Sequence, residues 1–239
     1  MSRLTILMYH RVDDCPTSTA LASNYVSPSR FADQLDAFLE WGYTPIEFDD
    51  WIAHRTRGAV LPPRPLIVTF DDGYTCFDLN AWPMLRARGI RPCVFLVAGE
   101  IGGTNSWEVE GQRTPLLSAN RIRALREEGV RFGAHGVRHV PLARVPTSDA
   151  RLELTRSRSM LEDVVGEPMR VFAYPYSNQN ASVRRLAREA GYHLAVRGKG
   201  RLNWTGTDPH GLRRILMNDR MTVRRLRRTL TRLRWLRVG

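Results

Sequence analysis

Short apolar runs alternate along this chain with segments of helical period, and this alternation limits the fold more than any other feature. Turn residues bound each run, and a glycine follows each helical segment, as strands and helix C-caps favour. The pattern predicts strand–helix units around a mainly parallel sheet, and hence an α/β fold that is a distorted or incomplete (β/α) barrel. The expected strands are Thr5 to His10, Leu66 to Phe70, Cys93 to Val97, Arg131 to Ala134, Val171 to Tyr174 and Leu194 to Arg197, and the expected helices begin at Ser27, Asn80, Ser118, Ser148 and Ala181.

The length of 239 residues suits a single domain. No internal repeat, low-complexity tract or long linker divides the chain, so residues 1–220 are expected to form one domain. Residues 221–239 hold seven arginines and no acidic residue. Their apolar residues recur at helical spacing, at Val223, Leu226, Leu230 and Leu233. This spacing predicts a basic, amphipathic C-terminal helix that packs on the barrel through its apolar stripe.

The formal charge of +12 is carried almost wholly by arginine, since Lys199 is the one lysine. A cationic helix face of the kind expected at 221–239 suits an anionic membrane surface, to which it would bind peripherally. A contact with nucleic acid is the alternative, but no stacking motif, zinc knuckle or recognition helix accompanies the arginines. Nucleic acid is therefore not expected as a partner.

Cysteine usage and the N-terminal residues bear on location. Cys15, Cys76 and Cys93 are odd in number and form no C-x-x-C pair, so neither a disulfide framework nor a thiolate metal site is predicted. Residues 1–12 contain only a short apolar run, which is too short for a secretory signal or a membrane span. The expected location is cytoplasmic, with contact to the inner membrane face through the basic helix.

Two adjacent carboxylates, Asp71 and Asp72, follow an apolar strand and precede Gly73. Parallel strands place functional groups at their carboxyl ends, and the turn that a glycine permits can aim both carboxylates into one site. Two such acids can divide metal binding and proton transfer between them. The alternative for this segment alone is an ordinary Asp-Gly turn with a capping aspartate.

Two histidines, His135 and His139, follow another expected strand. The four-residue spacing predicts that both imidazoles lie on one side of a helical turn, where a metal can bind both. Two histidines and one carboxylate leave open positions for water and substrate, as a catalytic metal site requires. Zinc fits this set, although cobalt, nickel or iron would also accept it.

These motifs resemble the polysaccharide deacetylase family, the carbohydrate esterases with a NodB homology domain. T-F-D-D-G at 69–73 matches the first family motif, and H-G-V-R-H at 135–139 matches the second, with Gly136 where serine or threonine is usual. F-A-Y-P-Y-S at 172–177 lies where the family carries R-x-P-Y, and M-Y-H-R-V at 8–12 is similar to the opening of the poly-N-acetylglucosamine deacetylase branch. The resemblance extends from about Leu4 to Leu216.

The resemblance implies a NodB-type catalytic domain over residues 1–220 and a metal-dependent hydrolase that removes N-acetyl or related acyl groups from a carbohydrate. Asp71 would be the general base, and one divalent metal ion, expected to be Zn²⁺, would bind Asp72, His135 and His139. The main-chain N–H of Tyr176 would face the developing oxyanion.

The chain departs from the family pattern at two points. Ala173 stands where the family carries an arginine next to the base, and the late histidine that supplies the acid is missing. His10, at the carboxyl end of the first strand, is the expected acid, with a packing role as its alternative, and His210 is the second candidate. Arg214 is a candidate for the missing arginine.

Substrate recognition is expected from aromatic residues near predicted loops. Trp107, Tyr174 and Trp204 could stack on sugar rings, although aromatic side chains more often pack in cores. A carbohydrate or a lipid-linked amino sugar is the expected substrate, because a cytoplasmic enzyme does not reach an exported polymer. The alternatives are a deformylase or deacetylase of a lipid-linked amino sugar and a glycan-binding or membrane-associated relative without turnover.

Overall fold

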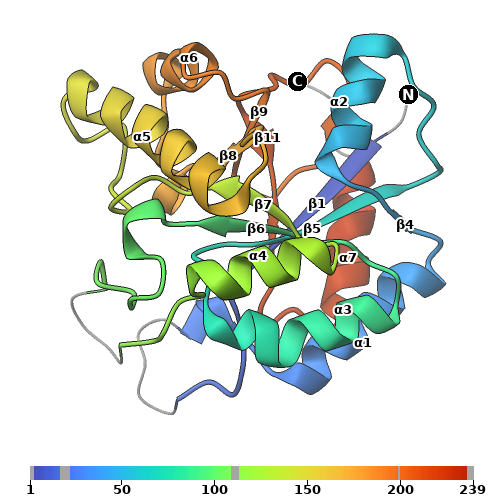
Figure 1. Ribbon diagram of the computed structural model, residues 1–239. Coiled ribbons are helices and arrows are strands. Elements are labelled where there is room, and N and C mark those ends of the chain that lie inside the picture. The colour runs from blue at the N-terminus through green and yellow to red at the C-terminus, as the bar shows by residue number, and fades with distance from the viewer. Residues whose placement is uncertain (1–2, 17–21, 109–112, 199, 236–239) are drawn as a thin grey trace.

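A computed structural model describes residues 3–16, 22–108, 113–198 and 200–235 (Figure 1). Its centre is a sheet of parallel strands that pair with one another in chain order. These strands are β1 (Arg3–Tyr9), β5 (Pro65–Phe70), β6 (Cys93–Leu96), β7 (Arg131–Ala134), β8 (Val171–Ala173) and β9 (Leu194–Arg197). The order and direction confirm the expected α/β architecture.

The sheet closes on itself through one short segment of chain. Strand β11 (Leu212–Arg213) pairs with β9, and β12 (Ile215–Leu216) pairs with β1. Only Arg214 separates these two strands, so the segment joins the two ends of the sheet into a nearly closed barrel. The remaining strands are short: β4 (Thr44–Pro45) pairs with β5, β10 (Asn203–Trp204) is antiparallel to β1, and β2 (Arg11–Val12) pairs with β3 (Tyr25–Val26).

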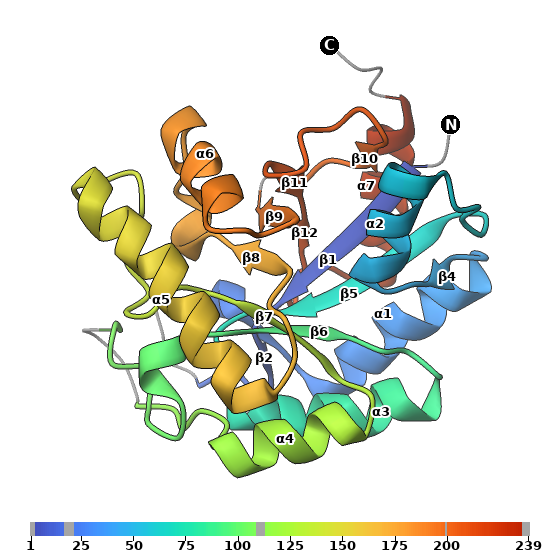
Figure 2. The same ribbon diagram turned by 45° about the horizontal axis from the view of Figure 1, so that its top comes forward.

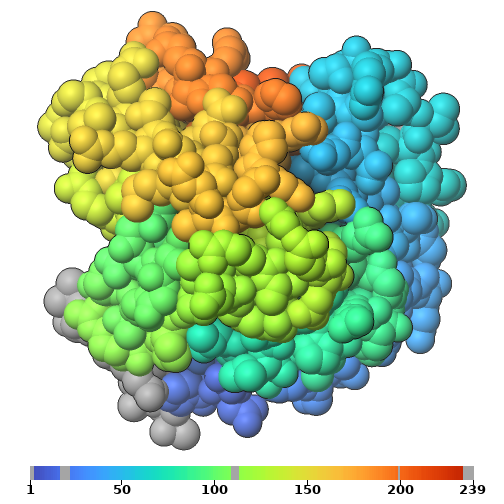
Figure 3. All heavy atoms as spheres, in the orientation of Figure 1, coloured from blue at the N-terminus to red at the C-terminus, as the bar shows by residue number. Residues whose placement is uncertain are grey.

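Helices cover the outside of this barrel (Figures 1 and 2). They are α1 (Pro28–Glu40), α3 (Trp82–Ala87), α4 (Ala119–Glu127), α5 (Thr147–Val165), α6 (Ala181–Glu189) and α7 (Val223–Trp235). Figure 3 shows the side chains of α3, α4 and α5 over one face. Two helices begin earlier than the sequence predicts. A π-helix, Phe77–Ala81, starts before the expected Asn80 and leads into α3, and α5 begins at Thr147 rather than Ser148. No helix in the described ranges is long and apolar enough to cross a membrane.

Helix α7 packs on the barrel through the apolar stripe that its sequence predicts. Leu226 and Leu230 are buried in the same core as α1. Leu233 packs against that core, and the arginines at 224, 225, 227, 228 and 232 are exposed. The division of the chain at residue 220 stays a prediction, and residues 236–239 lie outside the described part.

Helix α2 (Phe48–Arg57), which the apolar pattern did not reveal, blocks one end of the barrel. Glu47 and Asp50 form a capping box at its start. Phe48 and Trp51 are buried in one cluster with inward-facing strand residues such as Ile67. Because α2 packs at the amino ends of the strands, the carboxyl ends are left for a functional site.

Candidate metal centre and active site

The two carboxylates follow β5 in a tight left-handed turn. Asp71 and Asp72 are 3% and 4% exposed, and the N–H of Asp71 donates to the carbonyl of Tyr9 at 2.9 Å. Asp72 has φ +75° and Gly73 has φ +80°. A Cβ at Gly73 would lie 2.7 Å from Leu96 Cδ2, so only glycine fits this turn. The turn reverses the chain directly after the strand and keeps both carboxylates at its carboxyl end.

The two histidines follow β7 in a loop, and the expected helical turn was wrong. Gly136 and His139 both have positive φ, +82° and +56°, which breaks helical geometry between the imidazoles. The buried carboxylate of Glu153, on α5, accepts from the N–H groups of Val137 and Arg138 at 2.7 and 3.0 Å. Glu153 therefore fixes the loop that presents His139, a role that the sequence patterns did not reveal.

Asp72, His135 and His139 converge on one point. Asp72 Oδ1 lies 3.5 Å from His135 Nε2 and 3.4 Å from His139 Nε2, and the two Nε2 atoms are 3.2 Å apart. A tetrahedral metal with bonds of about 2.0–2.2 Å places its ligand atoms roughly 3.3–3.6 Å from one another. Asp72 Oδ1 is buried and has no hydrogen-bond partner among the described residues. The three side chains thus fit a divalent metal ion.

The protonation states of these groups also suit a metal. Burial lowers the pKa of His135 to about 4, so its ring is neutral at pH 7. His135 Nδ1 lies 2.7 Å from the carbonyl of Ala173, which accepts a hydrogen bond from the Nδ1–H group. The neutral ring then carries no proton on Nε2, which is free for a metal. Burial would raise the pKa of Asp72, but the contact with His139 and the nearby His10 and His135 together outweigh it and hold that pKa well below its ordinary value. A neutral imidazole and an ionised carboxylate are the forms that bind metal.

Arg214, between β11 and β12, forms an ion pair with the carboxylate of Asp71. Its Nη1 and Nη2 donate to Asp71 Oδ1 and Oδ2 at 2.6 and 2.7 Å, and Nη1 also donates to Thr69 Oγ1 at 3.0 Å. Burial would raise the pKa of Asp71, but Arg214 and the nearby His135 outweigh it and hold that pKa below its ordinary value. Arg214 therefore contacts Asp71 as the arginine missing at position 173 would.

A cavity of about 470 Å³ opens over these groups, and His10, Trp107 and Tyr176 line it. His10 directly follows β1, and its Nδ1 is buried without a partner among the described residues. The ring of His139 lies between two aromatic side chains, with its centroid 4.6 Å from Trp107 and 4.6 Å from Tyr176. These three expected residues do lie at one site.

Tyr176 also has an unusual backbone. It is the second residue of the 3₁₀ turn Pro175–Ser177, where a first-turn N–H has no carbonyl within its own turn. Its φ is +55°, and its side chain is 60% exposed. A non-glycine residue in this region stores strain of the kind that clusters at functional sites.

Three other expected residues have different positions. Tyr174 belongs to the cavity lining, but it is only 1% exposed and donates its hydroxyl to the carbonyl of His210. His210 precedes β11, and its Nε2 lies 2.9 Å from the carbonyl of Tyr192, so it sits at the opposite end of the strands from the metal ligands. Trp204 pairs with Arg3 at the start of β1, also far from its carboxyl end.

A buried ion pair supports the cavity wall, and the sequence patterns did not reveal it. Arg11 is 1% exposed, and its Nη2 donates to both oxygens of Glu108 at 3.0 and 2.9 Å. The hydroxyl of Tyr74 bridges the two, accepting from Arg11 and donating to Glu108. Since Glu108 follows Trp107 in the chain, this pair fixes the backbone that carries the indole beside His139.

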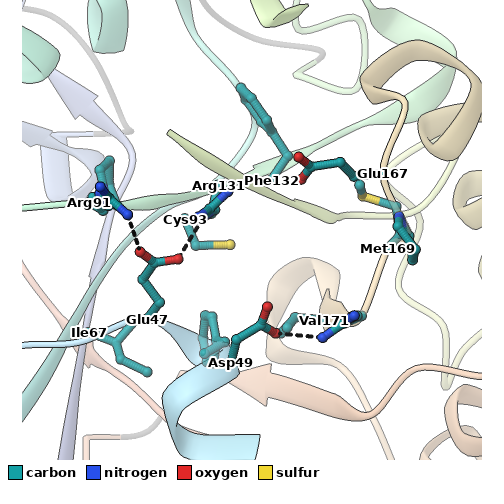
Figure 4. Close-up of a pocket in the computed structure, with 14 residues that line it drawn as sticks. Glu47, Asp49, Ile67, Arg91, Cys93, Arg131, Phe132, Glu167, Met169 and Val171 are labelled. Carbon is teal, nitrogen blue, oxygen red and sulfur yellow. Dashed lines mark hydrogen bonds and ion pairs between the residues drawn. The ribbon is translucent and has the colours of Figure 1, made fainter. Parts of the chain in front are cut away.

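A second cavity, of about 280 Å³, lies at the amino ends of the strands beside α2 (Figure 4). Glu47 faces Arg91 and Arg131 across it, with ion pairs of 3.2 and 2.6 Å. Asp49 pairs with Arg170 at 3.3 Å. Most of its charged groups are paired with one another, and the described residues that line it show no convergence of carboxylate and imidazole groups like that around Asp72.

Comparison with known proteins identifies the family. The model of the polysaccharide deacetylase family matches residues 59–195, more than half of the chain. The chain belongs to this family. The match confirms the resemblance seen in the motifs.

Two curated relatives and one solved structure are similar over most of the chain. A polysaccharide deacetylase of Bacillus subtilis, YxkH, is 20% identical over 82% of the chain, which spans 64% of the length of YxkH. The poly-β-1,6-N-acetyl-D-glucosamine N-deacetylase of Staphylococcus aureus is 21% identical over 89% of the chain and 78% of that enzyme. The Streptococcus pyogenes deacetylase PplD, solved with acetate, shares the fold with a TM-score of 0.82, at 21% identity over 95% of the chain and 97% of PplD.

Replacing Arg214 by methionine is expected to raise the pKa of Asp71. Without the guanidinium, burial dominates, so the carboxylate protonates at a higher pH. In a plot of deacetylation kcat/KM against pH, the acidic limb should shift to higher pH by about one to three pH units. Arg91→Met, at the far end of the barrel, should leave the limb in place. An unmoved limb in the Arg214 variant would show that Asp71 is not the titrating base.

Replacing Glu153 by glutamine is expected to weaken metal binding by about 10- to 100-fold. The amide has one acceptor oxygen and cannot serve both N–H groups and Arg138, so the loop that carries His139 loosens. Calorimetric titration of metal into metal-free protein measures the effect. Glu162→Gln, on the same helix, is the matched control, and equal affinities in the two variants would contradict the role of Glu153.

Proposed function

We propose that this chain is a metal-dependent N-deacetylase that hydrolyses the acetamido group of an amino sugar in a carbohydrate or glycoconjugate. The convergence of Asp72, His135 and His139 beside a carboxylate held by Arg214 carries this proposal. The family to which the chain belongs supports it. Binding alone would need no base, so the buried, ionised Asp71 favours turnover over a glycan-binding role.

We infer that the ion is Zn²⁺, held by Asp72 Oδ1 and the Nε2 atoms of His135 and His139. Two imidazoles and one carboxylate at these separations suit tetrahedral zinc, with a position left for water. When bound, such an ion lowers the pKa of its water and polarises the amide carbonyl.

Asp71 is the proposed general base. Its low pKa keeps it ionised at neutral pH, so its carboxylate can take the proton of the attacking water. Arg214 occupies both oxygens of Asp71 and orients them. We infer that the main-chain N–H of Tyr176, a residue of the cavity lining, donates to the oxyanion that develops on the carbonyl oxygen.

His10 is the proposed general acid. Its ring lines the cavity and lies near enough to both aspartates to lower their pKa values. It would donate a proton to the amide nitrogen as the C–N bond breaks, which releases the free amine and leaves the acyl group as a carboxylate. The burial of His210, whose Nε2 contacts the carbonyl of Tyr192, supports His10 over His210 as the acid.

The proposed sugar contacts are Trp107 and the exposed ring of Tyr176. The Staphylococcus aureus relative is named for its action on poly-β-1,6-N-acetyl-D-glucosamine, which supports an N-acetylglucosamine unit as the reacting sugar. A formyl group in place of acetyl, and a lipid-linked sugar in place of a polymer, are the related alternatives.

Purified protein supplied with zinc is expected to release acetate from N-acetylglucosamine oligomers. Asp71→Asn should lose the activity but retain metal, because it removes the base and spares the ligands. His135→Ala should lose both activity and stoichiometric metal. Enzymatic detection of acetate, beside metal analysis, separates the two variants. Undiminished release by Asp71→Asn would overturn the assigned base, and no release from acetyl or formyl sugars, free or lipid-linked, would overturn the hydrolase.

We further propose that α7 brings the enzyme to an anionic membrane surface. Its arginines are largely exposed, and its sequence contains no acid. Arg224, Arg227 and Arg228 line a shallow groove with Trp41, an arrangement that suits lipid headgroups. Cytoplasmic location is proposed with it, and the three free cysteines suit a reducing compartment.

Vesicle binding tests the role of α7. The triple variant Arg224→Gln/Arg227→Gln/Arg228→Gln should bind phosphatidylglycerol vesicles on the order of a hundredfold more weakly, because each arginine contributes about 1 kcal/mol. Co-sedimentation at low salt measures the affinity. The control Arg123→Gln/Arg144→Gln/Arg156→Gln removes the same charge from other exposed positions. Equal losses in both variants would mean that net charge, not α7, governs binding.

A further inference from the structure

Two arginines stand side by side on the outer face of the barrel, at the carboxyl ends of β9 and β11. Arg213 of β11 is in register with Arg197 of β9, and the two strands are parallel. The flanking residues Val196 and Leu212 belong to the inward-facing cluster. Because side chains alternate along a strand, Arg197 and Arg213 both point outward. Like charges on neighbouring positions repel each other, so this pairing favours an anion between them.

The two guanidinium groups lack partners. Arg197 Nε and Arg213 Nη1 are both buried and have no hydrogen-bond partner among the described residues. A buried donor without a partner is costly, and a ligand that accepts from it recovers that cost. Both arginines therefore hold unused donor capacity.

A third guanidinium belongs to Arg184 on α6, whose Cδ lies 3.5 Å from the position that a Cβ at Gly211 would take, two residues before Arg213. Together with burial, Arg213 and Arg184 lower the pKa of Arg197, which shows that the three positive charges lie close together. Asp208 is the acid near them within the described ranges. It is already engaged by Arg184 Nε at 2.9 Å and by the N–H of His210 at 2.9 Å. The cluster thus keeps an excess of positive charge.

The cluster adjoins the active-site cavity. Gly198, the residue after Arg197, donates its N–H to Ser177 Oγ at 2.7 Å, and Ser177 lines that cavity. A Cβ at Gly198 would lie 2.7 Å from Ser177 Oγ and 3.5 Å from Met8 Cε, a second residue of the lining. The backbone that carries Arg197 therefore continues directly into a residue that contacts the cavity wall.

We propose that Arg184, Arg197 and Arg213 form a subsite for an oxyanion, a phosphate or carboxylate, that the substrate carries beside its N-acyl sugar. The proposal rests on the proposed deacetylase function and names its substrate class, an anionic glycoconjugate. Guanidinium groups suit this role because their planar donors match phosphate and carboxylate oxygens.

Direct binding tests the subsite without relying on activity. Inorganic sulfate, titrated calorimetrically into the metal-loaded protein, should bind at least about tenfold more weakly to Arg197→Gln/Arg213→Gln than to wild type. The control Arg144→Gln/Arg156→Gln loses the same charge from exposed positions elsewhere and should bind like wild type. Absence of sulfate binding to wild type, or equal affinity in the subsite variant, overturns the proposal.

Comparing KM for charged and neutral substrates tests whether the subsite contributes to substrate binding in the deacetylation reaction. Wild type should show a lower KM for N-acetylglucosamine 1-phosphate or N-acetylmuramic acid than for neutral N,N′-diacetylchitobiose. The subsite variant should lose this preference with kcat for the neutral sugar unchanged. A preference for the phosphate alone or the carboxylate alone identifies the oxyanion, and a preference that survives in the variant overturns the assignment. Absence of turnover on every substrate would reject the deacetylase function, while sulfate titration would still decide the subsite.

Discussion

The ion pair between Arg214 and Asp71 joins the closure of the barrel to the chemistry of its opening. Arg214 is the single residue between β11 and β12, the strands that connect the last and first parts of the sheet. Its side chain points inward and binds both oxygens of Asp71. The same residue that lies where the sheet closes therefore keeps a buried carboxylate ionised. A charge at this depth is stable only because its partner is equally buried and correctly oriented.

Burial has opposite effects on the groups around the metal position, and the site needs both. It disfavours the cation of His135 and so leaves a neutral imidazole with a free Nε2. It also disfavours the anions of Asp71 and Asp72, but in each case a neighbouring ring or guanidinium more than compensates. Ligand and base are thus ready in their working protonation states before substrate arrives.

The sequence predicted the parts of the site that depend on strand ends. Asp71, Asp72, His135 and His139 each follow a strand, and parallel strands bring such positions together whatever the details of the loops. The conformation of the histidine loop was not predictable in this way, because it depends on Glu153, which is distant in sequence. The Arg214 contact bridges 143 positions, so no local pattern could establish it. The apolar pattern did not predict helix α2, because its few buried residues give a weak periodic signal.

Helix α2 also limits the directions from which substrate and water can enter the barrel and products can leave it. With Phe48 and Trp51 filling the amino end of the barrel, the axis is closed on that side, and the cavity above the metal position opens only toward the loops. In the proposed reaction, acetate is released next to Asp72 and His135, which are 4% and 2% exposed and so lie deep in this cavity. It leaves either after the sugar or by way of a gap beside it. The order of product release is therefore set by how tightly the loop residues hold the deacylated sugar.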